Sequence, residues 1–553
     1  MTNRSNVRFK AVTSQQSVLF PSNLSDKIAA NHPVRLVNQI VDQLDIDDIL
    51  STYKGGGTSS YHPRIMIKIL FYSYLNNVYS CRKIERQLQE NIHYMWLSGQ
   101  ATPNFRTINN FRSQKLKSKI QQLFAGMVRL MNEMGFVSLD VQYIDGTKIE
   151  AASNRYSFVW RGSVEKYKAK LETKINSVLK SIESVMNDEQ SQAEDDHLPE
   201  AIDSKLLEEK IRLLNANRLE LTRKQQKQIK NLEQDALPRM KKYEQQLDIL
   251  GERNSFSKTD TDATFMRMKE DHMKNGQLKP ACNVQISTEN QFITGFSLHR
   301  RAGDTATLIP HMEQFQKLYG KQSSTIVADS GYGSEQNYQH LEDQNIDAFI
   351  KYNYFHAQQK HNYKNNPFLP AHLFYNSEKD FYVCPMGQHL TFQGEGRRKT
   401  ELGFMYRVSI YQAHNCKGCP LRGKCHKAKG ERTIEVNYNL NRLRQIARDK
   451  LTSESGIYHR SMRPIEPEAV FGQLKWNNKF NRFSFRGLPK VEIEMGLMAI
   501  GHNLRKLVAR ILVSKPNKSA FYVLVFEFEP QIDGRKLLLQ PTGNNFGNLM
   551  TAA

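Results

Sequence analysis

Apolar residues recur at helical spacing through the first part of the chain. The segment 34–50 has them every three or four positions, and Pro63 can begin a helix through RIMIKILFYSYLNN because proline fits the first turn. Ser80 can cap a second helix, and a basic third one, NFRTINNFRSQKLKSKI, follows Pro103. Short helices ending in a basic one predict a helix-turn-helix-like DNA-binding module over residues 1–135. An ordinary helical domain with a solvated basic face has the same pattern.

The pattern changes to strands after residue 136. VSLDVQYIDGTKI (137–149) alternates and is rich in β-branched residues, which predicts a strand, and a hairpin is predicted around Glu289-Asn290. The elements that follow are a helix at 304–319, a strand at 323–333, a helix at 334–344 and a strand at 347–352. This succession predicts a layered α/β domain.

A long helical segment interrupts the strands. Apolar residues recur at spacings of three and four in a heptad-like seam, at Val164, Tyr167, Leu171, Ile175, Val178, Ile182, Val185, Leu207, Ile211, Leu214, Leu221, Ile229, Leu232, Ala236, Met240, Tyr243, Leu247 and Leu250. The acidic break at 187–201 is expected to turn the chain. We therefore predict an antiparallel coiled hairpin inserted into the α/β domain.

The rest of the chain has a Cys-rich part, a helical part and a tail. Residues 361–440 are expected to be loop-rich, and residues 466–512 helical with a break near Gly487. The predicted domains are therefore 1–135, a core from 136–160, 255–360 and 450–512, a helical insertion at 161–254, a Cys-rich insertion at 361–449 and a tail at 513–553.

The charge balance indicates a polyanionic partner. The chain of 553 residues has 78 Lys and Arg against 56 Asp and Glu, a net charge of +22. The N-terminal residues are polar and long apolar runs are absent, so neither secretion nor membrane insertion is expected. With only six cysteines, four of them within 384–425, a disulfide framework is not expected, which favours a reducing cytoplasm.

Three carboxylates stand where chemistry is often found. Asp145 and Asp329 each end a predicted strand at a turn, and Glu468 lies on a predicted helix. Each one alone is more often a turn or helix-start residue. Together they suit hard divalent cations such as Mg²⁺, two of which can drive an in-line phosphoryl displacement.

Basic and aromatic residues alternate after the glutamate. Cations can neutralise phosphates while rings stack on bases, although the rings can equally be core. The candidate DNA-binding residues are Lys475, Trp476, Lys479, Arg482 and Arg486, with Arg106 and Arg112 from the basic N-terminal helix.

The cysteines form a candidate zinc site. Cys384, Cys416, Cys419 and Cys425 can supply four thiolates, and the CxxC spacing suits tetrahedral zinc. A loop-rich segment would need such a structural Zn²⁺. Further candidate ligands are His389, His414 and His426. The alternative is four reduced cysteines without metal.

An ordered set of motifs resembles an insertion-sequence DDE transposase. The motifs are DGTKIEA (145–151), YSFVW (156–160), NVQIS (283–287), VADSGYGS (327–334), EAVFGQLK (468–475), RFSFRG (482–487) and HNLRK (502–506). The resemblance implies an RNase H-like catalytic core with a helical N-terminal domain, a coiled helical insertion and a late Cys cluster. It also implies Asp145, Asp329 and Glu468 as catalytic ligands of two Mg²⁺ or Mn²⁺ ions.

By this resemblance, the reaction is hydrolysis at the ends of the element followed by joining of the 3′-OH to target DNA. The implied partners are double-stranded DNA, as terminal inverted repeats and target, and a second copy of the chain in a synaptic complex, all in the bacterial cytoplasm at the nucleoid. Glu466 competes with Glu468, and the roles of Tyr458, Arg460 and Arg463 stay open. The alternatives are a non-catalytic DNA-binding relative and a nuclease without strand transfer.

Overall fold

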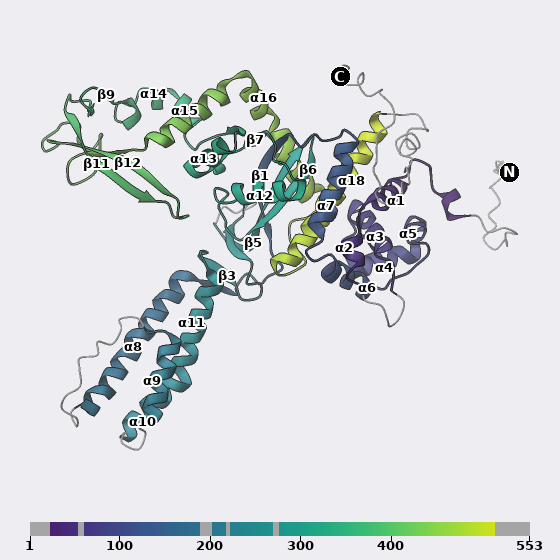
Figure 1. The fold of residues 1–553 in the computed structure, drawn as a ribbon, viewed down its shortest axis with the longest axis horizontal. Coiled ribbons are helices and arrows are strands. Elements are labelled where there is room, and N and C mark those ends of the chain that lie inside the picture. Colours follow the sequence, from purple (N-terminus) through teal and green to yellow (C-terminus); the bar gives the residue numbers. More distant parts are fainter. Residues whose placement is uncertain (1–22, 54–59, 188–201, 217–221, 269–275, 515–553) are drawn as a thin grey trace, which may run out of the picture. The chain divides into compact units, whose positions relative to one another are not determined.

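The computed structural model describes residues 23–53, 60–187, 202–216, 222–268 and 276–514 (Figure 1). Contacts divide the chain into two units, residues 1–115 with 504–553 and residues 116–503. Within the described ranges, no helix combines the length and apolar character that a membrane crossing requires.

The first unit is built from short helices whose starts follow from the sequence. Helices α1 (Pro33–Gln43) and α3 (Pro63–Leu75) each have proline in the first turn. The rings of His32 and His62 cap them, each Nδ1 accepting a backbone N–H at 3.2 Å. The other helices are η1 (Leu24–Lys27), α2 (Asp47–Leu50), α4 (Cys81–Glu90), α5 (Ile92–Leu97), α6 (Phe105–Asn110) and the π-helix η2 (Phe111–Lys115).

The expected basic helix is shorter than predicted. It ends with η2, and the chain turns at Ser118, whose φ is 62°. Helix α7 (Ile120–Glu133) then begins in the second unit. A non-glycine residue with positive φ cannot continue a right-handed helix, so one predicted helix becomes two elements.

A six-stranded mixed sheet forms the centre of the second unit. Strand β1 (Val141–Glu150) lies antiparallel to β5 (Leu278–Glu289) and parallel to β7 (Thr325–Ala328), which is parallel to β8 (Asp347–Ile350). The strands β4 (Thr264–Arg267) and β6 (Phe292–His299) pair with β5. The predicted mixed α/β architecture is confirmed, and the order β6-β5-β1-β7-β8 is consistent with an RNase H-like core.

Helices pack on both faces of the sheet, because successive residues of each strand point to opposite faces. Ile144, Ile326 and Ala328 pack against residues of α12 (Leu308–Tyr319) and α13 (Glu335–Asp343). Their neighbours Tyr143 and Val327 join a separate buried cluster. That cluster includes Leu451 of α15 (Tyr438–Thr452), and α16 (Glu454–Met462) follows. A period of two thus gives both faces a buried layer.

The described residues of the segment 161–250 are helical, as their apolar spacing indicates. It enters and leaves through the pair β2 (Phe158–Trp160) and β3 (Ser255–Ser257). The helices are α8 (Arg161–Asn187), α9 (Ser204–Ala216), α10 (Arg223–Asn231), the π-helix η4 (Leu232–Ala236) and α11 (Leu237–Leu250). Seam residues such as Leu171, Ile211 and Met240 share one core, whereas Tyr167 is exposed. The expected turn at 187–201 lies almost wholly outside the described residues.

The expectation of a loop-rich segment at 361–440 is wrong. A five-stranded antiparallel sheet forms there, in the order β13-β12-β11-β10-β9. Its strands are β9 (Phe374–Asn376), β10 (Phe381–Val383), β11 (His389–Lys399), β12 (Met405–Ala413) and β13 (Thr433–Val436). One face has its own core, which includes Tyr382, Leu390 and Tyr411. The strands are polar on the other face, so their apolar content is too low to suggest a sheet.

The chain then returns to helix. The π-helix η8 (Pro464–Glu468), α17 (Ala469–Gly472) and the π-helix η9 (Gln473–Asn477) precede the predicted break, and α18 (Leu488–Ser514) follows it. The predicted tail, including its β-prone run FYVLVFEF, lies outside the described residues beyond Ser514.

A buried carboxylate next to this break predicts a pH effect on stability. Asp260 is buried and accepts the backbone N–H of Gly487 at 3.2 Å. Burial raises its pKa above the ordinary 3.8, so the folded state binds more protons and stability falls as pH rises above about that value. Asp260→Asn should remove this fall, so that the variant gains stability relative to wild type between pH 4 and pH 7. Thermal melting across that range measures it, and parallel curves would contradict the expectation.

Candidate active site

Asp145 lies in β1, and Asp329 directly follows the neighbouring parallel strand β7. The register of the two strands pairs Tyr143 with Val327, and each aspartate stands two residues beyond that pair. β7 ends at Ala328, and Asp329 caps the turn η5 (Ser330–Tyr332), its Oδ1 accepting the N–H of Gly331 at 2.8 Å. The expectation that Asp145 ends its strand is wrong, because β1 continues to Glu150 in pairing with β5.

Arg463 connects Asp145 with Glu468. Its guanidinium nitrogen lies 3.8 Å from Asp145 Oδ1 and 3.8 Å from Glu468 Oε1. Arg463 immediately precedes the π-helix, in which residues five apart lie on one face. Of the three residues whose roles the sequence left open, Arg463 is thus the one that contacts the acids, whereas Tyr458 is exposed.

Glu466 faces away from this group. It is only 2% exposed, and its Oε2 accepts the N–H of Gln291 in the β5–β6 turn at 2.8 Å. Burial raises its pKa. Glu468, by contrast, has a side chain that is 51% exposed and an oxygen near Arg463. The geometry therefore favours Glu468 over Glu466 as a residue that can meet a ligand.

The acids are not arranged as a preformed metal site. In the part of the chain that the structure describes, no three His, Cys, Asp or Glu side chains come together as a group that could hold a metal ion. The cation of Arg463 instead compensates two of the carboxylates. The ligand types fit a hard divalent ion, since all three residues offer carboxylate oxygens.

Two neighbours of the acids, Tyr332 and Lys351, were not among the predicted site residues, although Tyr332 lies within the motif VADSGYGS. Tyr332 is fully buried, and its pKa is raised well above 10.0 by burial and by Asp145, Asp304 and Asp329. Lys351 follows β8, and its pKa is lowered by burial and by Arg463 and Arg460, while Asp329 and Glu468 oppose this shift. The charges of at least two of the predicted acids therefore shift the pKa of each of these side chains.

The predicted DNA-binding residues after Glu468 divide into buried and exposed ones. Lys475 is buried and donates its Nζ to the carbonyl of Lys148 at 3.1 Å, so it supports β1 and does not face solvent. Trp476 is 62% exposed, and Lys479 is also exposed. Phe480 and Phe483, considered for base stacking, are core residues whose rings lie 5.3 Å apart.

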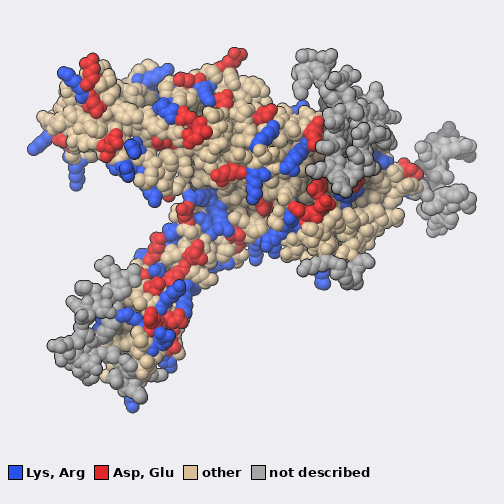
Figure 2. Space-filling view, in the orientation of Figure 1, with Lys and Arg blue, Asp and Glu red and all other residues tan. Residues whose placement is uncertain are grey.

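The two arginines that follow are tied to the backbone after β1. Arg482 donates to the carbonyls of Ala151 and Ser153, each at 3.2 Å, and Arg486 donates to Ala152 at 2.7 Å. Both remain exposed. Arg482 also lies 3.9 Å from Glu150, which has two further cationic neighbours, Arg155 and Lys279. In Figure 2, Lys and Arg side chains gather on the visible face over β5.

Of the two candidate DNA-binding residues in the N-terminal unit, one is exposed and the other is buried. Arg106 is exposed, whereas Arg112 is buried and donates to the carbonyl of Tyr79 at 2.9 Å and to the hydroxyl of Tyr74 at 3.2 Å. A role of Arg112 in contacting phosphates is therefore not supported.

Arg112→Ala should lower the free energy of unfolding by about 1–3 kcal/mol, because it leaves the Tyr79 carbonyl buried without this donor. The matched variant Arg106→Ala should leave the melting temperature unchanged and weaken binding to duplex DNA. Thermal melting and DNA binding of both variants measure the difference. Equal melting temperatures would contradict the assignment.

The four late cysteines line one small cavity. Cys384, Cys416, Cys419 and Cys425 surround a volume of about 20 Å³ together with His426, and none of them is in a disulfide. Arg432 donates its side chain to Cys425 Sγ at 3.0 Å and its backbone N–H to Cys416 Sγ at 3.4 Å. Both ring nitrogens of His426 are buried without a hydrogen-bond partner.

The other two histidines have different surroundings. His389 stacks on Phe381, with ring centroids 3.9 Å apart, and His414 contacts Thr391 Oγ1 at 2.8 Å. Cys384 and Cys416 pack against the core of the sheet. A metal is thus not needed to explain order in this segment, which removes one reason for predicting zinc.

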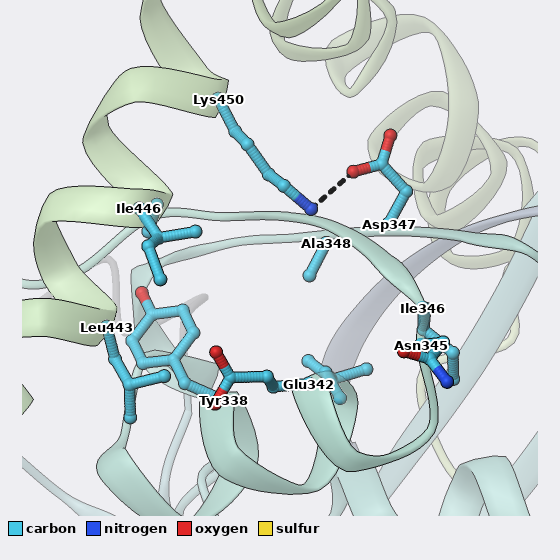
Figure 3. A pocket seen from close by; sticks show the side chains of 11 residues that line it. Tyr338, Glu342, Asn345, Ile346, Asp347, Ala348, Leu443, Ile446 and Lys450 are labelled. Atoms are coloured by element: carbon cyan, nitrogen blue, oxygen red, sulfur yellow. Dashed lines mark hydrogen bonds and ion pairs between the residues drawn. The ribbon is translucent and has the colours of Figure 1, made fainter. Parts of the chain in front are cut away.

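A cavity of about 330 Å³ lies between α13, β8 and α15 (Figure 3). Apolar side chains such as Leu443 and Ile446 line it, and Lys450 pairs with Asp347 at its edge at 2.5 Å. It contains none of the predicted acids. We therefore do not assign it to the chemistry of the site.

The described core defines a class of protein, a mixed α/β fold in which one aspartate lies in a strand of a parallel pair and the other directly follows the second strand. Two family models match the chain, a Transposase DDE domain at residues 383–508 and a Transposase domain (DUF772) at residues 22–114. They confirm the resemblance to an insertion-sequence DDE transposase. The first match includes Glu468 and the four cysteines but neither aspartate. No curated protein and no solved structure gives a significant match.

Proposed function

We propose that this DDE transposase cleaves DNA at the ends of its own insertion element and joins the freed 3′-OH to target DNA. The observation that supports it is the shared surrounding of three acids from distant parts of the chain. Asp145 and Asp329 each stand two residues beyond the last residue pair of β1 and β7, and Arg463 lies 3.8 Å from both Asp145 and Glu468. The DDE domain implies dependence on a divalent metal ion.

Asp145, Asp329 and Glu468 would hold two Mg²⁺ or Mn²⁺ ions through their carboxylate oxygens. Such ions supply activation of the attacking oxygen and stabilisation of the leaving oxygen. Without metal, Arg463 neutralises Asp145 and Glu468 and holds their side chains near each other. Because Glu468 is half exposed, it is free to turn between Arg463 and an ion.

The exposed cations and Trp476 would bind DNA. Lys479, Arg482 and Arg486 are exposed on the segment between Glu468 and α18, and Arg106 is exposed in the first unit. Contacts of this kind position the backbone and carry no sequence information. The substrate would be duplex DNA with terminal inverted repeats, held by a homodimer at the nucleoid in the bacterial cytoplasm.

The test is a joining assay with a labelled element end and a plasmid in Mg²⁺. Nicking at the end followed by insertion supports the proposal. Binding without cleavage would indicate a non-catalytic DNA-binding relative, and cleavage without insertion would indicate a nuclease. The required substrate comes from the DNA that flanks the coding region.

We further propose a structural zinc ion at Cys384, Cys416, Cys419 and Cys425. The four thiol groups share one cavity, and N–H groups of Arg432 point at two of the sulfurs, as is suitable for thiolates. Elemental analysis should find about one zinc per chain, and Cys416→Ser should lower that content. A metal-free protein with normal melting behaviour would overturn the proposal.

A further inference from the structure

Asp304 is a fourth carboxylate in the neighbourhood of the acids. It lies in the loop between β6 and α12, and its Oδ1 accepts from Asn283 Nδ2 at 2.7 Å and from Gln285 Nε2 at 3.0 Å. Both amides belong to fully buried residues on β5, two positions apart and hence on one face. The carboxylate is therefore held in place by the strand that pairs with β1.

Gly146, the residue after Asp145, makes room for this carboxylate. A Cβ atom at Gly146 would lie 2.8 Å from Asp304 Oδ1 and 2.3 Å from Gln285 Nε2. Gly146 does not have a positive φ, so close packing and not backbone conformation favours glycine there. In the turn capped by Asp329, a Cβ at Gly331 would lie 3.7 Å from Asp304, at ordinary contact distance.

The loop of Asp304 also holds the Asp329 turn directly. Thr305 donates its hydroxyl to the carbonyl of Gly331 at 2.8 Å. Asn337 donates to the carbonyls of Thr305 and Tyr332, each at 2.8 Å. The hydroxyl of Tyr332 donates back to Gln285, the residue that holds Asp304. A closed, buried hydrogen-bond network therefore connects β5, the loop and the turn.

We propose that Asp304 is a positioning residue, which fixes the turn carrying Asp329 against β1 and so sets the spacing of Asp145 and Asp329. The expected effect on metal binding rests on the proposed function, because the spacing of Asp145 and Asp329 matters only if they bind a pair of metal ions. The positioning itself does not depend on metal and can be measured separately. No hydrogen bond to the second oxygen of Asp304 is found among the described residues, and the residue is only half-buried.

The variant Asp304→Ala removes the acceptor and leaves two buried amides without it. Deuterium exchange of the metal-free full chain should become about tenfold faster in the peptide 329–335, because the turn loses its support. Mn²⁺ binding, followed by calorimetry, should weaken about 10–100-fold, as for other residues that orient ligands. Asp304→Asn keeps one acceptor oxygen and should restore most of the slow exchange.

The matched control is Glu313→Gln, an exposed acid on α12, which should change neither measurement. Unchanged exchange and Mn²⁺ binding in Asp304→Ala would overturn the proposal. Faster deuterium exchange in Asp304→Ala and in Glu313→Gln alike, with no recovery in Asp304→Asn, would also overturn the proposal. If wild type and Glu468→Gln bind Mn²⁺ equally weakly, the proposed function fails instead, while the exchange data still decide the positioning role.

Discussion

Asp145→Asn is expected to abolish cleavage of the element end, with a loss of about 10³-fold or more. A metal ion contributes several kcal/mol to stabilising charge in such a reaction, and each 1.4 kcal/mol is a factor of ten. Asparagine preserves the shape of Asp145 beside Asp329 but lacks the charge that attracts two cations. Glu468→Gln should have a comparable effect, whereas binding of the DNA end should be retained, because neither change removes a cation. Strand cleavage in Mg²⁺ and binding in its absence measure the two expectations.

The matched control is Glu466→Gln, two residues from Glu468. Its side chain faces the β5–β6 turn, so cleavage should continue near the wild-type rate. Wild-type cleavage by Asp145→Asn would remove that residue from the mechanism. If Glu466→Gln lost cleavage and Glu468→Gln kept it, Glu466 and not Glu468 would be the third catalytic acid.

Gly333→Ala is expected to damage both folding and cleavage. A Cβ at this position would lie 2.4 Å from the carbonyl oxygen of Lys351 and 3.0 Å from the Cα of Tyr352, so backbone must move. Forcing atoms into a packed site costs about 1–3 kcal/mol. The residue follows the turn capped by Asp329, and a displacement of about 1 Å can lower a rate 10²-fold. Thermal melting and end cleavage of the variant measure both losses.

Gly472→Ala serves as the control for this change. Gly472 lies in α17, and a Cβ there would have no neighbour within 4 Å. Alanine in a helix is favoured over glycine by about 0.5–1 kcal/mol, so this variant should be at least as stable as wild type. An equal loss of stability in both variants would mean that crowding at Gly333 is not the cause.

Much of the central fold could be predicted because each element has its own period. The helix expected at 334–344 is α13 (Glu335–Asp343), and the strand expected at 347–352 is β8 (Asp347–Ile350). The second sheet could not be predicted, because its longest strand, His389–Lys399, is mostly polar and has few buried residues. Half-exposed strands give weak patterns, and their order is fixed by pairing between distant segments.

The candidate site was predictable in its residue types and not in its contacts. Asp145 and Asp329 stand next to apolar strand segments, which local pattern reveals. The choice between Glu466 and Glu468 depends on helix rotation, since residues two apart point about 200° from each other. The folded chain places Arg463, which directly precedes the π-helix, 3.8 Å from Glu468.

The sequence by itself determined the alternation of strands and helices, the three acids, the basic surplus and the resemblance to DDE transposases. These are properties of short segments and of their order. The tertiary structure decided that Arg463 pairs with two acids, that Asp304 packs closely against Gly146, and that Lys475 and Arg112 are buried. Such contacts join residues up to hundreds of positions apart, and local hydrophobic pattern contains no record of which distant surface will cover a given side chain.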